Sequence, residues 1–140
     1  MSVIDLVQGV AGRFAMVFDA YLYFWQYSVP VVVAALVAIA MDWPGGDEQR
    51  RIRPWLLWAF PLLVSTWGVL FEHTDKTSAA PAWPSYGIGA LLLLQLLTTA
   101  VLVVRLRGRR WYAAGVGLLA GFFGLGAAVF GVMSVTGQWL

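Results

Sequence analysis

Four long apolar stretches limit what this chain of 140 residues can fold into. They cover residues 21–41, 55–71, 86–104 and 111–136, and none of them contains Asp, Glu, Lys, Arg or His. A helix needs about 20 apolar residues to cross a bilayer, because each residue adds about 1.5 Å across a core of about 30 Å. The pattern therefore predicts an all-α integral membrane protein with four transmembrane helices.

The connections between the apolar stretches are short and polar. Residues 42–54 contain turn-forming glycines and prolines, residues 72–85 contain two prolines, and residues 105–110 are an arginine-rich turn. Short connections favour antiparallel neighbours, so we expect an up-down antiparallel bundle for the domain 21–140. Pro30 and Pro61 lie inside the first two stretches and predict kinks there, because proline removes a helical hydrogen bond.

Basic residues gather on one side of this predicted bundle. Seven of the nine Lys and Arg residues lie in the first and third connections: Arg50, Arg51, Arg53, Arg105, Arg107, Arg109 and Arg110. The positive-inside rule then predicts that loops 42–54 and 105–110 are cytoplasmic and that both termini are outside. The strong preference for Arg over Lys, together with abundant Ala, Gly and Val, suggests a bacterial protein and hence the inner membrane.

Residues 1–20 form a separate, amphipathic segment. Val3, Val7, Val10, Phe14 and Val17 recur at steps of three and four, while the polar residues fall largely on another face. This period is typical of a helix with one apolar face. We expect an amphipathic helix that lies in the outer membrane interface or docks on a partner.

The distribution of charge excludes several classes of function. With 61% hydrophobic and 11% charged residues, and no ionisable group inside a predicted span, a proton-coupled pump or a voltage sensor is disfavoured. The absence of cysteine excludes disulfides and thiolate metal sites. The net charge of +2 and the short arginine clusters beside the predicted spans do not indicate nucleic-acid binding.

One cluster of potential metal ligands lies after the second apolar stretch. Glu72, His73 and Asp75 could bind Zn²⁺ or Cu²⁺, or His73 could act as a base. Neighbouring residues at a helix end point in different directions, however, and a single histidine is weak evidence for a site. We favour a solvated outer loop over a metal or catalytic site.

Three polar residues interrupt the third stretch. Gln95 lies within the leucine-rich run and is followed by Thr98 and Thr99. A carboxamide in hydrocarbon needs a partner, and we favour a hydrogen bond to a neighbouring helix. The alternatives are a polar pore lining, or a contact with a quinone or a lipid headgroup.

The fourth stretch is rich in small residues at helical spacing. Those that define the pattern are Gly117, Gly121, Gly124, Ala127 and Gly131. Small residues let helix backbones approach closely, so the pattern predicts tight packing against another helix. That helix could belong to this bundle or to another chain.

These features favour a non-catalytic accessory or structural subunit of a larger bacterial membrane complex, such as a respiratory or photosynthetic one. A small homo-oligomeric channel or carrier with a neutral polar lining is the first alternative. A membrane enzyme that uses Glu72, His73 and Asp75 at the outer face is the second, although we expect no enzymatic activity. The expected partners are membrane lipids and other membrane subunits or a second copy, and the sequence assigns no cofactor.

Overall fold

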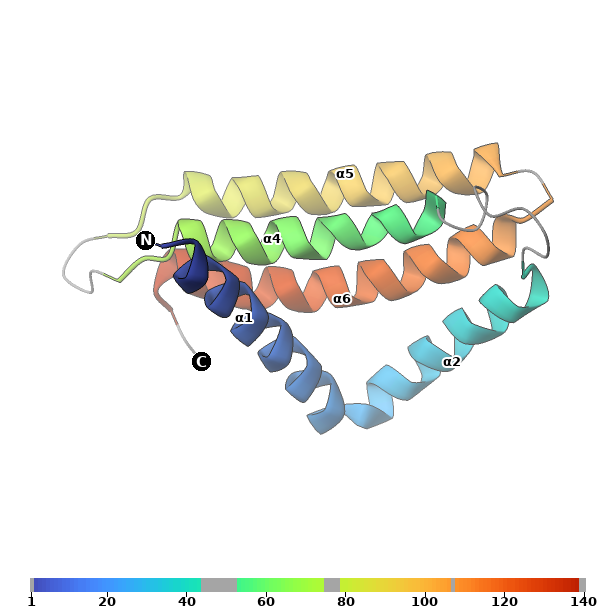
Figure 1. Cartoon of the computed structure of the whole chain (residues 1–140), viewed down its shortest axis with the longest axis horizontal. Coiled ribbons are helices and arrows are strands. Elements are labelled where there is room, and N and C mark those ends of the chain that lie inside the picture. The colour runs from blue at the N-terminus through green and yellow to red at the C-terminus, as the bar shows by residue number, and fades with distance from the viewer. Residues whose placement is uncertain (1, 44–52, 75–78, 107, 139–140) are drawn as a thin grey trace.

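A computed structural model describes residues 2–43, 53–74, 79–106 and 108–138 (Figure 1). In this part of the chain the regular elements are all helices, which confirms the all-α prediction. The elements are α1 (Val3–Tyr23), α2 (Trp25–Met41), the short 3₁₀ helix η1 (Leu56–Trp58), α4 (Ala59–Leu70), α5 (Trp83–Arg105) and α6 (Arg110–Thr136).

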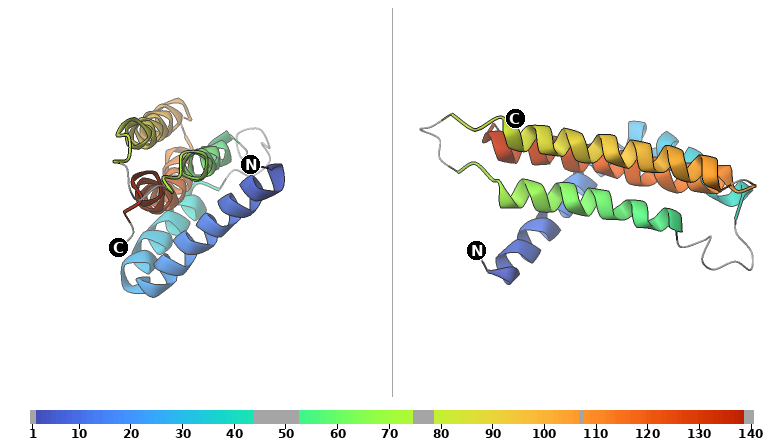
Figure 2. Two further views of the ribbon diagram at one scale, coloured as in Figure 1. Left: turned by 90° about the vertical axis from the view of Figure 1, so that its left-hand side faces the viewer. Right: turned by 90° about the horizontal axis from the view of Figure 1, so that it is seen from above.

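Helix α6 lies at the centre of the fold. Helices α4, α5 and α6 run side by side, α2 packs on another side of α6, and α1 lies across α4 and α6 (Figures 1 and 2). In the end-on view of Figure 2, α2, α4 and α5 surround α6. Small side chains on several sides of one helix let its neighbours approach it closely.

The glycines of α6 allow this close approach. A Cβ atom added to Gly115 would lie 2.6 Å from the carbonyl oxygen of Ala35 in α2. On another side, a Cβ atom added to Gly68 of α4 would lie 3.0 Å from the Cα atom of Gly131. The first distance is shorter than real Cβ atoms show, and the second is tighter than most of their contacts. The α2–α6 and α4–α6 contacts therefore depend on glycine.

Helices α1 and α2 form a V rather than one continuous helix. They are bent by 102° at Phe24, which has φ −96° and ψ 38°. The hydroxyl of Ser28 donates to the carbonyl oxygens of Tyr21 and Phe24, at 3.0 and 3.3 Å. The bond to Tyr21 supplies a partner for a carbonyl at the end of α1, whereas the Phe24 carbonyl also accepts from the backbone N–H groups of Tyr27 and Ser28. The bend thus lies six residues before Pro30, which sits within α2.

The helix lengths support part of the predicted membrane topology. Helices α5 and α6 are each long and apolar enough to cross a membrane, and α1 and α2 pass the same test only as a bent pair. The described chain therefore has two candidate spans, or three if the bent pair is one span. Helix α4 has 12 residues and follows η1, so four spans stay a prediction.

Helix α1 packs on the bundle along part of its length. Val17 is fully buried, and the ring of Phe14 lies 5.0 Å from that of Phe123 in α6. By contrast, Val3 and Val7 of the predicted apolar face are 78% and 60% exposed. The predicted amphipathic segment is therefore a helix, but only the half that is nearer α2 uses its apolar face for packing.

The bundle has two chemically different ends. The start of α1, the end of α6 and the described parts of the connection between α4 and α5 lie at one end, while the end of α2, the end of α5 and the start of α6 lie at the other (Figure 1). The described arginines of the first and third connections therefore share an end, which is the arrangement that the helix order predicts. Arg50, Arg51 and Arg107 lie outside the described residues.

The glycine contacts generate a prediction about stability. Gly115→Ala should lower the stability of the purified protein by about 1–3 kcal/mol, because the added methyl group meets the backbone of α2. Gly12→Ala is the matched control, since a Cβ atom at Gly12 has no described neighbour within 4 Å. That change should raise stability slightly through helix propensity. Thermal unfolding followed by circular dichroism measures both, and equal effects would contradict the close α2–α6 packing.

Candidate functional site

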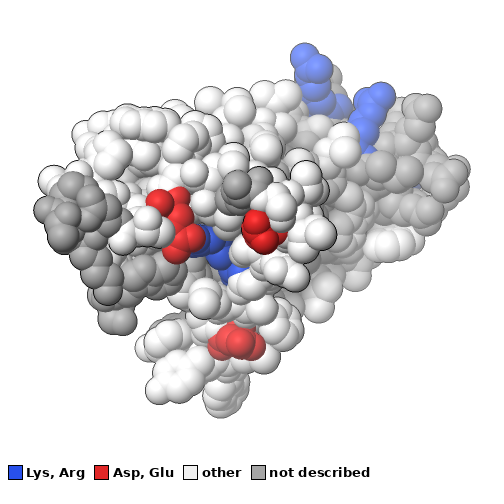
Figure 3. All heavy atoms as spheres, turned by 60° about the vertical axis from the view of Figure 1, so that its left-hand side comes forward, with Lys and Arg blue, Asp and Glu red and all other residues white. Residues whose placement is uncertain are grey.

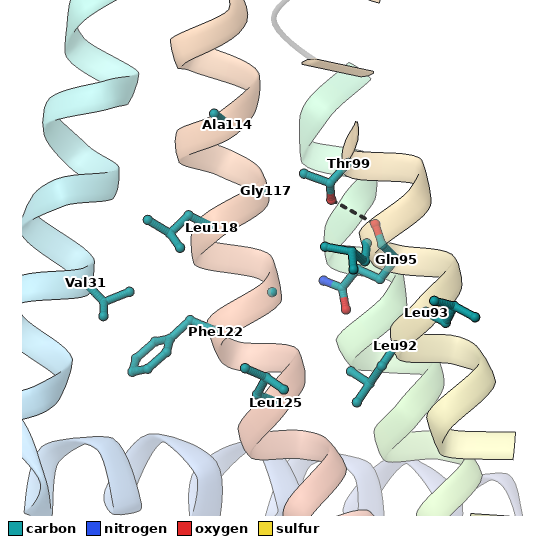
Figure 4. Close-up of a pocket in the computed structure, with 12 residues that line it drawn as sticks. Val31, Leu92, Leu93, Gln95, Thr99, Ala114, Gly117, Leu118, Phe122 and Leu125 are labelled. Carbon is teal, nitrogen blue, oxygen red and sulfur yellow. Dashed lines mark hydrogen bonds between the residues drawn. The ribbon is translucent and has the colours of Figure 1, made fainter. Parts of the chain in front are cut away.

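A groove of about 660 Å³ lies between α2, α5 and α6. In Figure 4, α6 forms its floor, and α2 and α5 form its two walls. The residues that line this Gln95 groove are Val31, Leu92, Leu93, Gln95, Leu96, Thr99, Ala114, Gly117, Leu118, Gly121, Phe122 and Leu125. None of these twelve is ionisable, so the groove is a neutral and largely apolar site.

The carboxamide of Gln95 is the polar group at this site. Gln95 is only 3% exposed, and neither its Nε2 nor its Oε1 atom has a hydrogen-bond partner among the described residues. Leaving a buried polar group unpaired costs about 1–3 kcal/mol. The groove therefore contains a donor and an acceptor that the described chain does not satisfy.

The interhelical hydrogen bond that we expected for Gln95 is not formed by the described residues. The position that faces its Oε1 atom is Gly124, where an added Cβ atom would lie 2.6 Å away. Glycine offers no side-chain donor, and backbone N–H groups in the middle of α6 are already used within the helix. The described residues therefore supply no partner for the carboxamide, and an interhelical bond of Gln95 stays a prediction.

Helical spacing places Gln95 and Thr99 in the same groove. They are four residues apart on α5, so they lie one turn apart on one face. The Thr99 hydroxyl donates to the backbone oxygen of Gln95 at 2.9 Å, and its methyl group meets Gly117 of α6. Between Gly117 and Gly124, a Cβ atom at Gly121 would have no described neighbour within 4 Å. Gly121 therefore faces open space.

Thr98 lies on another side of α5. It lines a separate hollow of about 450 Å³ together with Arg53, Phe60 and Arg105, and its hydroxyl donates to the Leu94 carbonyl at 2.7 Å. Successive helix residues point about 100° apart, which explains why two adjacent threonines face different hollows. The structure thus brings Gln95 and Thr99 together but does not bring Thr98 to them.

The small residues of α6 serve different neighbours. Gly117 and Gly124 meet α5, while Gly131 lies against Gly68 of α4 and near Ile88 of α5. Ala127 is 2% exposed and belongs to the buried core. Most of the predicted packing residues are therefore used within this bundle. Gly117 and Gly121 line the Gln95 groove, and of these two only Gly121 has no described neighbour within 4 Å of an added Cβ atom.

A second polar cluster ties α1 to the bundle at the end where the termini lie. The guanidinium of Arg13 donates to Glu72 Oε2 at 3.1 Å and to Ser134 Oγ at 2.6 Å, and Ser134 Oγ donates to the Gly68 carbonyl at 3.0 Å. Arg13 is 7% exposed. Figure 3 shows basic atoms recessed between acidic ones on this face. Arg13 thus links α1, α6 and the segment after α4.

The burial of Arg13 was missed at the sequence level, where it counted only as a basic residue of the outer side. A signal was present, because Arg13 lies three residues after Val10 and four before Val17. Those steps place it beside the apolar face of the helix rather than opposite that face.

The predicted metal ligands are only partly described. Glu72 is paired with Arg13, and the backbone N–H of His73 donates to the Ser134 carbonyl at 3.0 Å. Asp75 lies outside the described residues. Within the described ranges there is no group of three or more His, Cys, Asp or Glu residues that could hold a metal ion. A site that includes Asp75 stays a prediction.

The Arg13–Glu72 pair generates a prediction about coupling. Glu72→Gln should lower stability by about 1–2 kcal/mol, a moderate value because the Glu72 side chain is 43% exposed and water screens the pair. In an Arg13→Met background the same change should cost almost nothing. Asp19→Asn, also on α1, is the control and should be neutral. Thermal unfolding measures all variants, and an equal cost of Glu72→Gln in both backgrounds would refute the coupling.

The unpaired carboxamide generates a second prediction. Gln95→Leu should raise the stability of the delipidated protein by about 1–2 kcal/mol, since it removes a buried donor and acceptor at similar volume. Thr98→Val is the control and should change stability little, because that hydroxyl bonds only within its own helix. Thermal unfolding in one detergent gives the comparison. A lower melting temperature for Gln95→Leu would show that the carboxamide has a partner in the chain.

The chain was compared with known protein families, curated proteins and solved structures. No protein-family model matches the chain, and no curated protein and no solved structure matches it either.

Proposed function

We propose that this chain is a non-catalytic accessory subunit of a larger bacterial membrane complex, and that its binding surface is the Gln95 groove. The observation that carries this proposal is the carboxamide of Gln95, which is buried and has no hydrogen-bond partner among the described residues. A polar group at membrane depth has no water to bond, so it pairs with protein or with a bound molecule. An unpaired one on a residue that lines a groove, as Gln95 does, fits a site that something else completes.

The surroundings of the groove fit a site that is reached from within the membrane. Only 11% of the most apolar 18-residue window of α5 is buried. Leu93 and Leu96, at the edge of the groove, are 58% and 66% exposed. Such a wall contacts lipid on its outer side. A partner or ligand would therefore enter sideways, from the bilayer.

The same proposal includes the orientation of the chain. We place loops 42–54 and 105–110 in the cytoplasm and both termini outside, in a bacterial inner membrane. The support is the shared end of the described arginines Arg53, Arg105, Arg109 and Arg110, which the positive-inside rule assigns to the cytoplasm.

Two other functions have less support. A pore lined by Gln95, Thr98 and Thr99 would need all three in one lumen, and Thr98 faces a different hollow. An enzyme at the outer face would need a carboxylate available for chemistry, and Glu72 is paired with Arg13. The Gln95 groove therefore gives the better-supported function.

Purification in a mild detergent followed by native mass spectrometry tests the proposal. The wild-type chain should retain a companion, either a partner subunit or a bound molecule, and Gln95→Leu should retain at most about a tenth as much. Thr98→Val is the control, since it changes a polar residue of α5 outside the groove, and it should retain the companion. A wild-type chain that elutes alone and empty, or equal retention by Gln95→Leu, would contradict the proposal.

A further inference from the structure

We propose that the Gln95 groove binds a neutral apolar molecule that carries a hydroxyl group, either an isoprenoid-type quinol or an uncharged lipid such as a diacylglycerol. This inference rests on the proposed function and names the occupant of the same site. It follows from the charge, the hydrogen-bonding capacity and the volume of the groove.

The lining excludes a charged occupant. The twelve lining residues include no Asp, Glu, Lys, Arg or His, and their polar side chains are those of Gln95 and Thr99. A phosphate, carboxylate or ammonium group in this groove would lack a counter-charge, which is very unfavourable away from water. The occupant is therefore uncharged, at least at the end that reaches Gln95.

The unpaired atoms of Gln95 specify the polar group of the occupant. The Nε2 atom can donate and the Oε1 atom can accept, and both lack described partners. A hydroxyl satisfies both, because its oxygen accepts from Nε2 while its hydrogen is donated to Oε1. A quinone carbonyl can only accept, so it would leave Oε1 unpaired. The chemistry thus favours a quinol over the corresponding quinone.

The floor of the groove is open at Gly121. Helices α5 and α6 touch where Thr99 meets Gly117 and where Gln95 meets Gly124, and Gly121 lies in the open space between these contacts. A flat ring or a single acyl chain can lie on this part of α6.

The dimensions agree with such a molecule. The volume of about 660 Å³ falls in the usual range of about 300–1,000 Å³ for small-molecule sites. Along α6 the lining extends from Ala114 to Leu125, which is about 16 Å of helix. Val31 and Phe122 face this space from opposite sides and would contact the apolar body (Figure 4). Binding requires the carboxamide to turn about its soft terminal torsion toward Gly121.

Equilibrium binding to the full-length, delipidated protein in nanodiscs tests the inference. The probes are tritiated decylubiquinol, kept reduced under argon, and tritiated dioleoylglycerol. Unlabelled decylubiquinone and dioleoylphosphatidate serve as carbonyl-only and charged competitors. The wild type should bind at least one hydroxyl-bearing probe, and each competitor should bind at least about tenfold more weakly than that probe.

Three variants test the location of the site. Gln95→Leu removes the donor and the acceptor, and Gly121→Leu fills the groove at a position where an added Cβ atom meets no described neighbour. Each should weaken binding at least about tenfold. Gly89→Leu is the matched control on the exposed side of α5, where there is equal space, and should leave binding unchanged. Circular dichroism verifies that all three variants keep the helix content of the wild type.

The outcomes separate this inference from the proposed function. Binding of decylubiquinol alone supports the quinol source, and binding of dioleoylglycerol alone supports the lipid source. No binding of either probe, binding that Gln95→Leu and Gly121→Leu leave unchanged, or equal affinity for quinol and quinone would overturn the inference. If Gln95→Leu still loses a protein companion on purification, the proposed function stands without this ligand. If no companion is lost either, both are rejected.

Discussion

The close approach of three helices to the small residues of α6 is the constraint on which the rest of the structure depends. Gly115 lies against the backbone of α2, Gly131 lies against Gly68 of α4, and Gly124 lies against Gln95 of α5. Because these glycines already face neighbours, Gly121 is left on a side where no described helix approaches. The packing that closes the bundle therefore also leaves the floor of the Gln95 groove open.

Gln95 shows how packing and polarity compete at this interface. In a membrane, helices associate through close packing and hydrogen bonds rather than through burial from water. The contact with Gly124 brings α5 and α6 together, yet glycine has no side chain that could form a hydrogen bond with the carboxamide. In the described chain the carboxamide is buried without a partner, which lowers the stability of the fold by about 1–3 kcal/mol. Such local conflicts between stability and packing are typical of functional sites, where a ligand or partner restores the missing interactions.

The sequence predicted the elements better than their contacts. Helices α5 and α6 begin and end within three residues of the predicted stretches, because apolar length is a local property. The bend at Phe24 has no local signal comparable to Pro30, which stays inside a helix. The burial of Arg13 depends on Glu72 and Ser134, residues far away in the chain. The glycine pattern predicted close packing, but which glycine would be left facing a groove depends on how the helices are arranged around α6.

The most direct test of this account is the environment of the Gln95 side-chain amide in lipid bilayers. Solid-state NMR of isotope-labelled protein, with Gln95→Leu used to assign the glutamine signal, can detect which group forms a hydrogen bond with Nε2. The account predicts a hydrogen bond to a bound molecule and none to a carbonyl or side chain of this chain. A hydrogen bond from Nε2 to a carbonyl of α6 would contradict it, because Gln95 would then form an ordinary interhelical hydrogen bond.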